Sequence, residues 1–388
     1  MRSIFVASIS VAGVVFAGPA GAIDCSAPEH AIGLERIVEV DASGGPLFGA
    51  ISKQQKEPTF LREKEVVLTF DDGPSPWVTP RILDTLEHHC TRATFFSVGK
   101  MAVAYPVITR DIIARGHTLA GHTWAHPRQL PKMPAKRAQD EIERGFAALD
   151  AAAGGGIAPF FRFTGLNDSA PLLGYLQDRG VATFTVDVVT DDSFIADPAE
   201  LTRVTLARVV KRGGGILLFH DIKPATAKAL PAILEGLKER GFKVVHMRPS
   251  KAYVPRPEFV AGYRDKVAAN LEKSPYKPRL MPFYGAISVL RQANAATPLN
   301  AQSDLPVAVV SPAPRDRRLL KRRSNKKKSS KRRAKPPAEQ EVLPWKKKMA
   351  LPGGEAPAAS PEQSPAASTT SWRHIGPHPA ERAAPYIQ

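Results

Sequence analysis

Short apolar runs alternate with longer, periodically apolar stretches between about residues 64 and 248. The runs are rich in β-branched and aromatic residues, which is typical of strands: EVVLTF, ATFFSVG, PFFRF, VATFTVD, GGILLFH and FKVVHM. The stretches between them have the composition and period of helices and span residues 79–89, 105–115, 134–153, 198–211 and 224–240. This alternation predicts an α/β fold with a parallel sheet, either open and doubly wound or closed as a (β/α) barrel, and the number of strands favours the barrel.

Polar residues follow several of these predicted strands at the point where each strand ends. Asp71 and Asp72 follow EVVLTF, and Arg162 lies at the end of PFFRF. Asp187 follows TFTV, and His220 follows ILLF. Active sites of parallel α/β folds lie at the carboxyl ends of the strands. The sequence therefore predicts one site that gathers these side chains.

The regular alternation is flanked by segments of different composition. Residues 1–22 precede an N-terminal extension at 23–63, and the alternating domain occupies residues 64–250. Residues 251–311 have mixed composition and form a poorly defined extension. From residue 312 onward Pro, Ala, Ser, Lys and Arg dominate. Such a composition buries too little apolar surface to fold alone, so we expect a disordered tail.

The first 22 residues have the organisation of a secretory signal peptide. Arg2 precedes an apolar run at 4–16, and Ala20-Gly21-Ala22 forms a small-residue cleavage site. The alternative is an uncleaved membrane anchor, but this run is shorter than the ~20 residues that span a bilayer. We therefore expect an exported protein of the periplasm, the cell envelope or the extracellular space.

Only two cysteines occur in the chain, Cys25 just after the predicted cleavage point and Cys90. In an exported protein they can form one disulfide that ties the mature N-terminus to the domain. Their spacing is not that of a metal site, and the sequence does not decide whether they pair.

The net charge of +17 is concentrated near the C-terminus. Residues 315–348 contain sixteen Lys or Arg and three acids, a net charge of +13. Nucleic acid is an unfavourable partner, since the run KRRSNKKKSSKRRAKPP has no interleaved aromatic residues for base stacking. A solvated tail is the simplest interpretation, and we favour attachment to anionic envelope polymers or lipid headgroups. The sequence leaves the oligomeric state open.

Two histidines four residues apart, His122 and His126, stand in GHTLAGHTWAHPRQL. This spacing places two imidazoles on one side of a helical turn, where both reach one metal ion. Together with one carboxylate of the adjacent pair Asp71 and Asp72 they make the open three-ligand set of catalytic divalent-metal sites. Zn²⁺ suits these ligands, as do Co²⁺, Ni²⁺ and Mn²⁺. The other carboxylate of the pair would stay ionised near the metal and take a proton from water.

Four motifs then carry a family resemblance over residues 62–250. TFDDGPS, HTWAHP, a following arginine with an aspartate cluster, and LLFHD occur in the order and spacing of NodB-homology polysaccharide deacetylases, carbohydrate esterase family 4. The sequence is similar to this family, which implies a distorted, incomplete (β/α) barrel. It also implies removal of acetyl groups from N-acetylated sugars with a divalent metal, commonly zinc.

The resemblance assigns roles to matching positions. Asp71 would be the general base, His220 the general acid, and Asp72, His122 and His126 the metal ligands.

Further positions would support this chemistry. Arg162 would orient the base, and Asp192 would support the catalytic histidine or arginine, although Asp187 and Asp191 compete for that alignment. Leu218 would line the pocket for the acetyl methyl group.

Three residues near the motifs are expected to support the histidine loop or to contact substrate. Thr123 would help to fix the histidine loop, and Thr164 would contact substrate from the third motif. Trp77 beside the first motif stacks on a sugar ring or simply packs; the residues leave both readings open.

Two motifs depart from the family pattern. The third usually reads R-P-P-Y, whereas here Arg162 is followed by Phe-Thr-Gly, which leaves one oxyanion N–H donor unassigned. The fourth usually ends D-W, but Asp192 is followed by Ser193. We expect a more open acetyl pocket, or one filled by Phe163 or Phe194, and an altered substrate preference.

The predicted function is removal of acetyl groups from a glycan that contains N-acetylglucosamine. The alternatives are a catalytically silent carbohydrate-binding domain and a metal hydrolase of O-acetyl or other acyl groups. A pure binder has no reason to keep base, ligands and acid together, which favours the enzyme. The sequence does not choose between peptidoglycan, chitooligosaccharide and exopolysaccharide.

Overall fold

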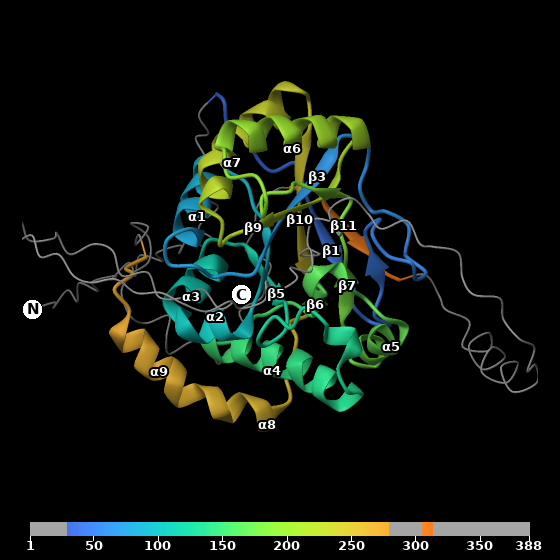
Figure 1. The fold of residues 1–388 in the computed structure, drawn as a ribbon. Coiled ribbons are helices and arrows are strands. Elements are labelled where there is room, and N and C mark those ends of the chain that lie inside the picture. Colours follow the sequence, from blue (N-terminus) through green and yellow to red (C-terminus); the bar gives the residue numbers. More distant parts are fainter. Residues whose placement is uncertain (1–28, 279–304, 313–388) are drawn as a thin grey trace, which may run out of the picture. The chain divides into compact units, whose positions relative to one another are not determined.

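The computed structural model of the chain describes residues 29–278 and 305–312 (Figure 1). The predicted signal peptide at 1–22, Cys25 and the basic run at 315–348 lie outside the described residues. Cys90 is disulfide-bonded, and Cys25 is the one other cysteine of the sequence. Within the described residues no helix is both long and apolar enough to cross a membrane.

Eleven strands form one sheet in which every pairing is parallel. Its order is β11-β1-β10-β3-β4-β5-β6-β7-β2, with β9 also on β3 and β8 on β9. The strands are β1 (Arg36–Val40), β2 (Leu47–Phe48), β3 (Glu65–Asp71), β4 (Thr94–Ser97), β5 (Thr118–Gly121), β6 (Phe160–Phe161), β7 (Ala182–Phe184), β8 (Val188–Val189), β9 (Gly215–His220), β10 (Lys243–Pro249) and β11 (Val307–Val310). No pairing joins β7 to β8 in the part of the chain that the structure describes. The prediction of an incomplete (β/α) barrel is thus confirmed.

Helices connect the strands and cover the outside of the curved sheet (Figure 1). They are α1 (Thr79–His88), α2 (Gly99–Ala104), α3 (Pro106–Ala114), α4 (Ala135–Ala153), α5 (Ala170–Asp178), α6 (Pro198–Arg212) and α7 (Pro224–Glu239), with short 3₁₀ turns η1 (Leu130–Lys132) and η2 (Thr164–Leu166). The start and end of α6 have clear local causes. The Asp197 carboxylate accepts a hydrogen bond from Glu200 N at 2.7 Å, and Gly213 ends the helix with a φ of 82°.

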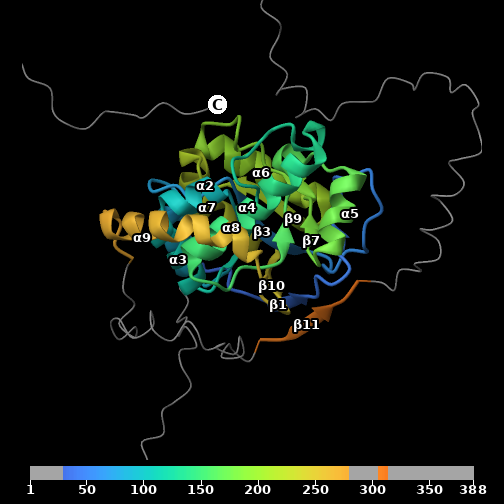
Figure 2. The same ribbon diagram turned by 90° about the horizontal axis from the view of Figure 1, so that it is seen from below.

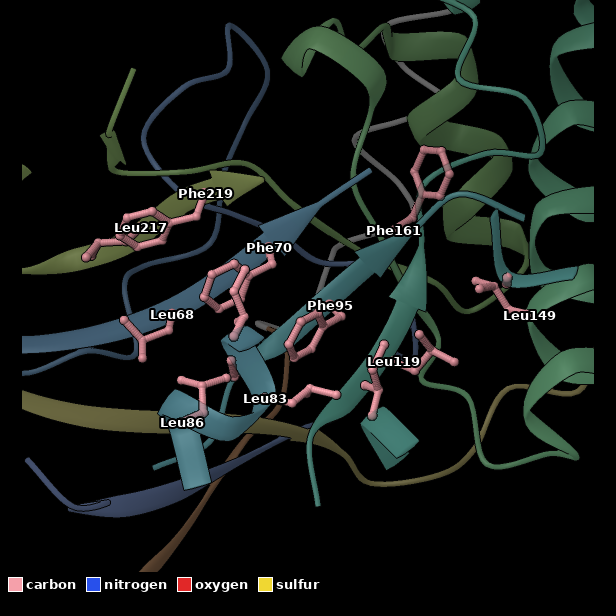
Figure 3. Close-up of a cluster of buried hydrophobic side chains, with 14 of the residues drawn as sticks. Leu68, Phe70, Leu83, Leu86, Phe95, Leu119, Leu149, Phe161, Leu217 and Phe219 are labelled. Atoms are coloured by element: carbon pink, nitrogen blue, oxygen red, sulfur yellow. The ribbon is translucent and has the colours of Figure 1, made fainter. Parts of the chain in front are cut away.

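The core lies between the sheet and this helical layer (Figure 3). All seven residues of β3 are buried, which explains its unbroken apolar run. The Phe70 ring stacks on Phe95 of β4 at 5.1 Å and on Phe219 of β9 at 5.5 Å between centroids. Leu83 and Leu86 of α1 are fully buried in the same cluster. This packing holds β4 against β3 and β9, whose carboxyl ends carry Asp71, Asp72 and His220.

Both flanking extensions contribute to the sheet. In the N-terminal one, β1 pairs with β10 and β2 with β7. A buried ion pair of 2.6 Å between Arg36 and Glu65 joins β1 to β3. The later extension supplies α8 (Pro257–Val260), η3 (Ala261–Tyr263), α9 (Arg264–Lys273) and the outer strand β11. Figures 1 and 2 show α8 and α9 lying across α2, α3 and α4.

Candidate metal and catalytic site

The carboxyl ends of neighbouring strands bring Asp71, Asp72, Arg162 and His220 to one edge of the barrel, whereas Asp187 bonds to Ile216 near the start of β9, so its predicted place in the site is wrong. Asp71 on β3 lies level with His220 on β9. Gly121 on β5 lies level with Phe161 on β6, and each immediately precedes a predicted site residue. Parallel strands in register thus gather side chains that lie up to 149 positions apart in the sequence.

The three predicted metal ligands come together at this edge. Their ligating atoms all lie within 4.8 Å of one another. Asp72 Oδ1 is 3.1 Å from His126 Nε2 and 3.4 Å from His122 Nε2. Asp72 has a φ of 81°, so the chain turns sharply directly after β3 and aims this carboxylate at the imidazoles.

The hydrogen bonds of His122 show that this group suits a cation. Its Nδ1 lies 2.7 Å from the carbonyl oxygen of Arg162, and a carbonyl only accepts, so Nδ1 carries the proton. In the neutral form of the ring Nε2 would present a lone pair to Asp72 Oδ1, a buried oxygen without a hydrogen-bond partner. Two acceptors that face each other at 3.4 Å need a positive charge between them. Two imidazoles and one carboxylate fit a borderline divalent metal.

The charges of the ligand group are coupled. Burial raises the pKa of Asp72, but the imidazoles of His122 and His126 outweigh it and bring that pKa well below its usual range. Burial lowers the pKa of His126, and the Asp72 carboxylate more than reverses this. A metal ion bound here would replace the proton that these groups otherwise share. Metal affinity should therefore fall as the pH is lowered.

The two histidines lie in a loop, so the helical turn expected from their spacing is wrong. Residues 122–126 form no helix, and Thr123 and His126 have φ values of 69° and 56°. The His126 N–H donates to Thr123 Oγ1 at 3.0 Å, which is the loop-fixing contact expected of that threonine. The Ala125 N–H donates to the Glu141 carboxylate of α4 at 3.0 Å. Hydrogen bonds to the loop backbone, rather than helical periodicity, bring the two imidazoles together.

A close approach of α4 supports the histidine loop from behind. Gly145 of α4 packs against the backbone of Thr123, and a Cβ atom at this glycine would lie 2.6 Å from the Thr123 carbonyl carbon. Only a residue without a side chain lets the helix come this near. Sequence reasoning missed both Gly145 and Glu141, since neither stands in a motif.

Asp71 is held by Arg162, as the third motif predicts. Arg162 is fully buried, and its Nη1 donates to Asp71 Oδ1 and to Thr69 Oγ1, each at 2.7 Å. Its Nε donates to the carbonyl of Phe184 at 3.2 Å. Burial lowers the pKa of Arg162 and Asp71 partly restores it. The other carboxylate oxygen of Asp71 lies 3.9 Å from His122 Nε2, on the side of the metal ligands.

His220 on β9 is the strand neighbour of Asp71 and also borders the predicted metal ligands, with its Nε2 3.9 Å from Asp72 Oδ2. Its Nδ1 donates to Asp192 Oδ1 at 2.7 Å, and its backbone N–H donates to Asp192 Oδ2 at 2.6 Å. Thr226 Oγ1 donates to the same oxygen at 2.7 Å. Burial lowers the pKa of His220, but Asp192, Asp72 and Asp71 raise it to about 10.

The structure separates Asp192 from its two competitors in the aspartate cluster. Asp187 accepts from the Ile216 N–H at 2.9 Å. Asp191 binds Arg208 at 2.7 Å. Of the three, Asp192 contacts His220.

The residues expected to touch substrate differ in their exposure. Leu218 is 7% exposed and lies two residues before His220 on β9, and Trp77 is 78% exposed. Thr164 is fully buried, and its hydroxyl donates to the Pro127 carbonyl at 2.7 Å, next to the histidine loop. That contact gives Thr164 a place in the support of the loop. Phe163 is 2% exposed, whereas Phe194 is 42% exposed.

Asp221 fixes the turn that follows the two aspartates. Its Oδ1 accepts from the Gly73 N–H at 2.8 Å and its Oδ2 from Thr79 Oγ1 at 2.7 Å. A Cβ at Gly73 would lie 2.0 Å from Asp221 Oδ2, so the position requires glycine. Burial raises the pKa of Asp221 to about 7. The turn after β3 is thereby tied to β9.

Comparison with known proteins decides the family. The family profile described as polysaccharide deacetylase matches residues 60–184. A chitooligosaccharide deacetylase of Bradyrhizobium sp. is 30% identical over 201 residues, which is 47% of this chain and 88% of that protein. The chain belongs to the polysaccharide deacetylase family.

Two further relatives of this polysaccharide deacetylase family member are matched over a smaller share of their own length. A peptidoglycan-N-acetylglucosamine deacetylase of Listeria monocytogenes is 30% identical over 226 residues, 57% of this chain but 46% of that protein. The solved structure of a peptidoglycan deacetylase of Bdellovibrio bacteriovorus has a TM-score of 0.51 and 29% identity. The match covers 57% of this chain and 61% of that one. The chain thus spans about half the length of the first of these relatives and under two thirds of the second.

Proposed function

We propose that this protein is a metal-dependent de-N-acetylase of a glycan that contains N-acetylglucosamine. One observation carries the proposal: Asp71 and His220 both border the group of Asp72, His122 and His126, with Asp71 Oδ2 3.9 Å from His122 Nε2 and His220 Nε2 3.9 Å from Asp72 Oδ2. Relatives named as deacetylases of peptidoglycan N-acetylglucosamine and of chitooligosaccharides support the substrate class.

The ligand group Asp72, His122 and His126 would hold one divalent metal, for which we favour Zn²⁺ over Co²⁺, Ni²⁺ or Mn²⁺. Bound there, the metal would polarise the acetyl carbonyl and lower the pKa of water toward neutrality. The hydrogen bond from His122 Nδ1 to the Arg162 carbonyl fixes the ring so that Nε2 is the ligand atom.

Asp71 is the proposed general base. Arg162 occupies Oδ1, so Oδ2 is the oxygen that faces the ligand group and can accept a proton from attacking water. The guanidinium also keeps the carboxylate in one orientation, and it is itself held by Thr69 Oγ1 and the Phe184 carbonyl. Orientation of this kind shortens the path of the proton at the moment of attack.

His220 is the proposed general acid. Asp192 binds Nδ1, which leaves Nε2 to face the ligand group and to donate a proton to the departing amine. The raised pKa keeps the imidazole protonated at neutral pH. A divalent cation beside Asp72 would offset part of that shift, which brings the pKa of the acid closer to the working pH.

The substrate side of the site combines an apolar wall with an exposed ring. Leu218 would contact the acetyl methyl group, and Trp77 would stack on a neighbouring sugar. Ser193, which replaces the tryptophan usual in the fourth motif, places Oγ 3.3 Å from His220 Nδ1. A hydroxyl in place of an indole leaves more room near the acid. This difference favours a second candidate function, the hydrolysis of O-acetyl or larger acyl groups.

Acetate release tests the proposal. The full chain would be stripped of metal, reloaded with Zn²⁺, Co²⁺, Ni²⁺ or Mn²⁺, and offered peptidoglycan, chitooligosaccharides, an N-acetylated exopolysaccharide and an O-acetylated glycan. We expect release from at least one N-acetylated glycan, and its loss in Asp71→Asn and His220→Ala. Release from the O-acetylated glycan alone would favour the esterase, and no release from any of them would favour a silent carbohydrate binder.

Export and envelope attachment complete the proposal. Residues 1–22 would direct export, and the basic run at 315–348 would hold the enzyme near anionic envelope polymers or lipid headgroups. Binding to envelope fractions should then weaken with added salt. A chain truncated before Pro312 should bind less than the full chain, and equal binding by the two would contradict the tail's role.

A further inference from the structure

The histidine loop carries an aromatic side chain, Trp124, that packs against the helical layer. Trp124 stands two residues from each of the histidine ligands, His122 and His126. A Cβ atom at Gly99, the first residue of α2, would lie 2.9 Å from Trp124 Cε3, so the indole lies directly on this glycine. The indole is partly buried and packs against the hydrophobic core. The position of the loop is therefore tied to the position of this ring.

Tyr263 of the C-terminal extension packs on the same indole. It is the last residue of η3 and is 8% exposed. The ring centroids of Trp124 and Tyr263 are 4.8 Å apart, within the range of a favourable aromatic pair. Arg144 of α4 binds both rings: its guanidinium lies 5.1 Å from the Trp124 centroid, and its Nε donates to the Tyr263 hydroxyl at 3.2 Å. The indole is thus in contact with α2, with α4 and with the extension.

The backbone of Trp124 links this ring to the ligand-bearing loop. Its N–H donates to the Glu141 carbonyl of α4 at 2.9 Å, and its carbonyl accepts from the Lys100 N–H of α2 at 2.9 Å. The next residue, Ala125, donates its N–H to the Glu141 carboxylate at 3.0 Å. Because the chain at Trp124 is held on both sides, a displaced indole would strain the peptide groups that lead to the two histidines.

The extension is fastened to the domain on both sides of Tyr263 in the sequence. Before it, the ring of Tyr253 lies 4.3 Å from that of Phe146 in α4, measured between centroids. After it, the Tyr276 hydroxyl donates to Asp111 Oδ2 of α3 at 2.6 Å. These contacts keep the extension across α2, α3 and α4 (Figures 1 and 2). Tyr263 is therefore held in place by contacts that do not involve the histidine loop.

We propose that Tyr263 is a positioning residue for the metal site: through its ring on Trp124, the extension holds the histidine loop in the conformation in which the three ligands meet. The proposal rests on the proposed function, since it takes these ligands to bind a metal. Thr123 and His126 have positive φ values of 69° and 56°. Such conformations are costly for residues other than glycine and persist only where surrounding contacts enforce them. Tyr263 supplies one such contact from outside residues 60–184, the part that the family profile matches.

Metal binding tests the proposal without reference to activity. The full chain would be stripped of metal and titrated with Zn²⁺, and the visible spectrum of bound Co²⁺ would be recorded at saturation, since it reports the arrangement of the ligands. Tyr263→Ala should bind Zn²⁺ about tenfold more weakly, the lower end of the about 10–100-fold cost of losing support for a metal ligand. Its Co²⁺ spectrum should differ from that of the wild type. Tyr263→Phe keeps the ring on Trp124 and should restore both the affinity and the spectrum.

Tyr276→Ala is the matched control, because it removes the same side chain from the same extension at a contact with α3. Both alanine variants should unfold at lower urea concentration than the wild type. Tyr276→Ala should keep the wild-type zinc affinity and Co²⁺ spectrum. An equal loss of affinity in the two variants would mean a general loosening of the extension and would overturn the role of Tyr263. Wild-type affinity and spectrum in Tyr263→Ala would show a packing contact alone and would also overturn it.

Acetate release separates this proposal from the proposed function. At limiting Zn²⁺, Tyr263→Ala should show a lower kcat with an unchanged KM, and excess Zn²⁺ should recover most of the rate. A raised KM with unchanged zinc affinity would place Tyr263 at the substrate and overturn the proposal. If the wild type bound metal but released no acetate from any glycan, the proposed function would fail, while the titrations would still decide on Tyr263. If Asp72→Asn bound Zn²⁺ as tightly as the wild type, both would fail.

Discussion

Replacing Gly145 with alanine should weaken metal binding, although the residue touches no metal ligand side chain. The added Cβ would lie 2.6 Å from the carbonyl carbon and 2.7 Å from the carbonyl oxygen of Thr123. Thr123 lies between the two histidine ligands in the sequence and is fully buried. Its carbonyl accepts a hydrogen bond from the Gly99 N–H at 3.0 Å. The backbone on both sides of the clash is therefore confined.

The size of the effect follows from the overlap. An ordinary contact starts at 3.4 Å, so α4 and the histidine loop must separate by about 0.8 Å. A functional constellation tolerates displacements of about 0.5 Å. Changes to the support of a metal ligand usually cost about 10–100-fold in metal affinity or activity. We expect Gly145→Ala to lose Zn²⁺ affinity in this range at the catalytic site.

Gly174 supplies the matched control. It also lies inside a helix, α5, but a Cβ there would meet nothing within 4 Å. Gly174→Ala should raise the free energy of unfolding by about 0.4–1 kcal/mol through the entropy of the unfolded chain, and leave metal affinity unchanged. Zinc titration of both variants beside the wild type compares their affinity at the predicted ligand group. If Gly145→Ala gained stability like Gly174→Ala and bound zinc as tightly as its parent, the argument from close approach would be refuted.

Three further predictions concern buried charges. Arg162→Met leaves a buried carboxylate without its partner, which should cost about 3–5 kcal/mol in urea unfolding and lower kcat by about 10–100-fold; an unchanged kcat would contradict its orienting role. Burial alone would lower the pKa of His220, and Asp192 is the main group that raises it, so in Asp192→Asn the alkaline limb of the kcat profile should move to lower pH; an unmoved limb would exclude His220 as the acid. His117 and His246 are buried and both pKa values are lowered by burial, that of His246 to about 3. Below about pH 6.5 the unfolded chain binds more protons at each, so stability falls with acid by up to about 1.4 kcal/mol per pH unit for each histidine. Chemical denaturation from pH 7 to 4.5 should show a shallower fall in His246→Gln, and equal slopes would refute the assignment.

Much of the fold could be predicted because long buried strands of a parallel sheet leave continuous apolar runs. β3 and β9 were visible in this way. The two-residue strands β2 and β8 are too short for a pattern and depend on β7 and β9 for their pairing. β11 is also short, and it depends for its pairing on β1, about 270 positions earlier in the sequence. Long-range pairing of short segments leaves no local signal.

The site was predictable to the extent that its residues stand in motifs at strand ends. Asp72, His122 and His126 meet as expected. The loop geometry between the histidines was not predictable, because positive φ values at Thr123 and His126 depend on anchors from α4. The partner of His220 was open among three neighbouring aspartates, and the register of β8 against β9 decides it.

Acetate release from N-acetylglucosamine oligomers, measured with the full chain before and after metal removal, tests metal-dependent deacetylation most directly. We expect that stripping abolishes release, that Zn²⁺ restores it, and that Asp71→Asn stays silent while still binding zinc at the catalytic site. Release that persists in the stripped protein, or that survives in zinc-loaded Asp71→Asn, would contradict it.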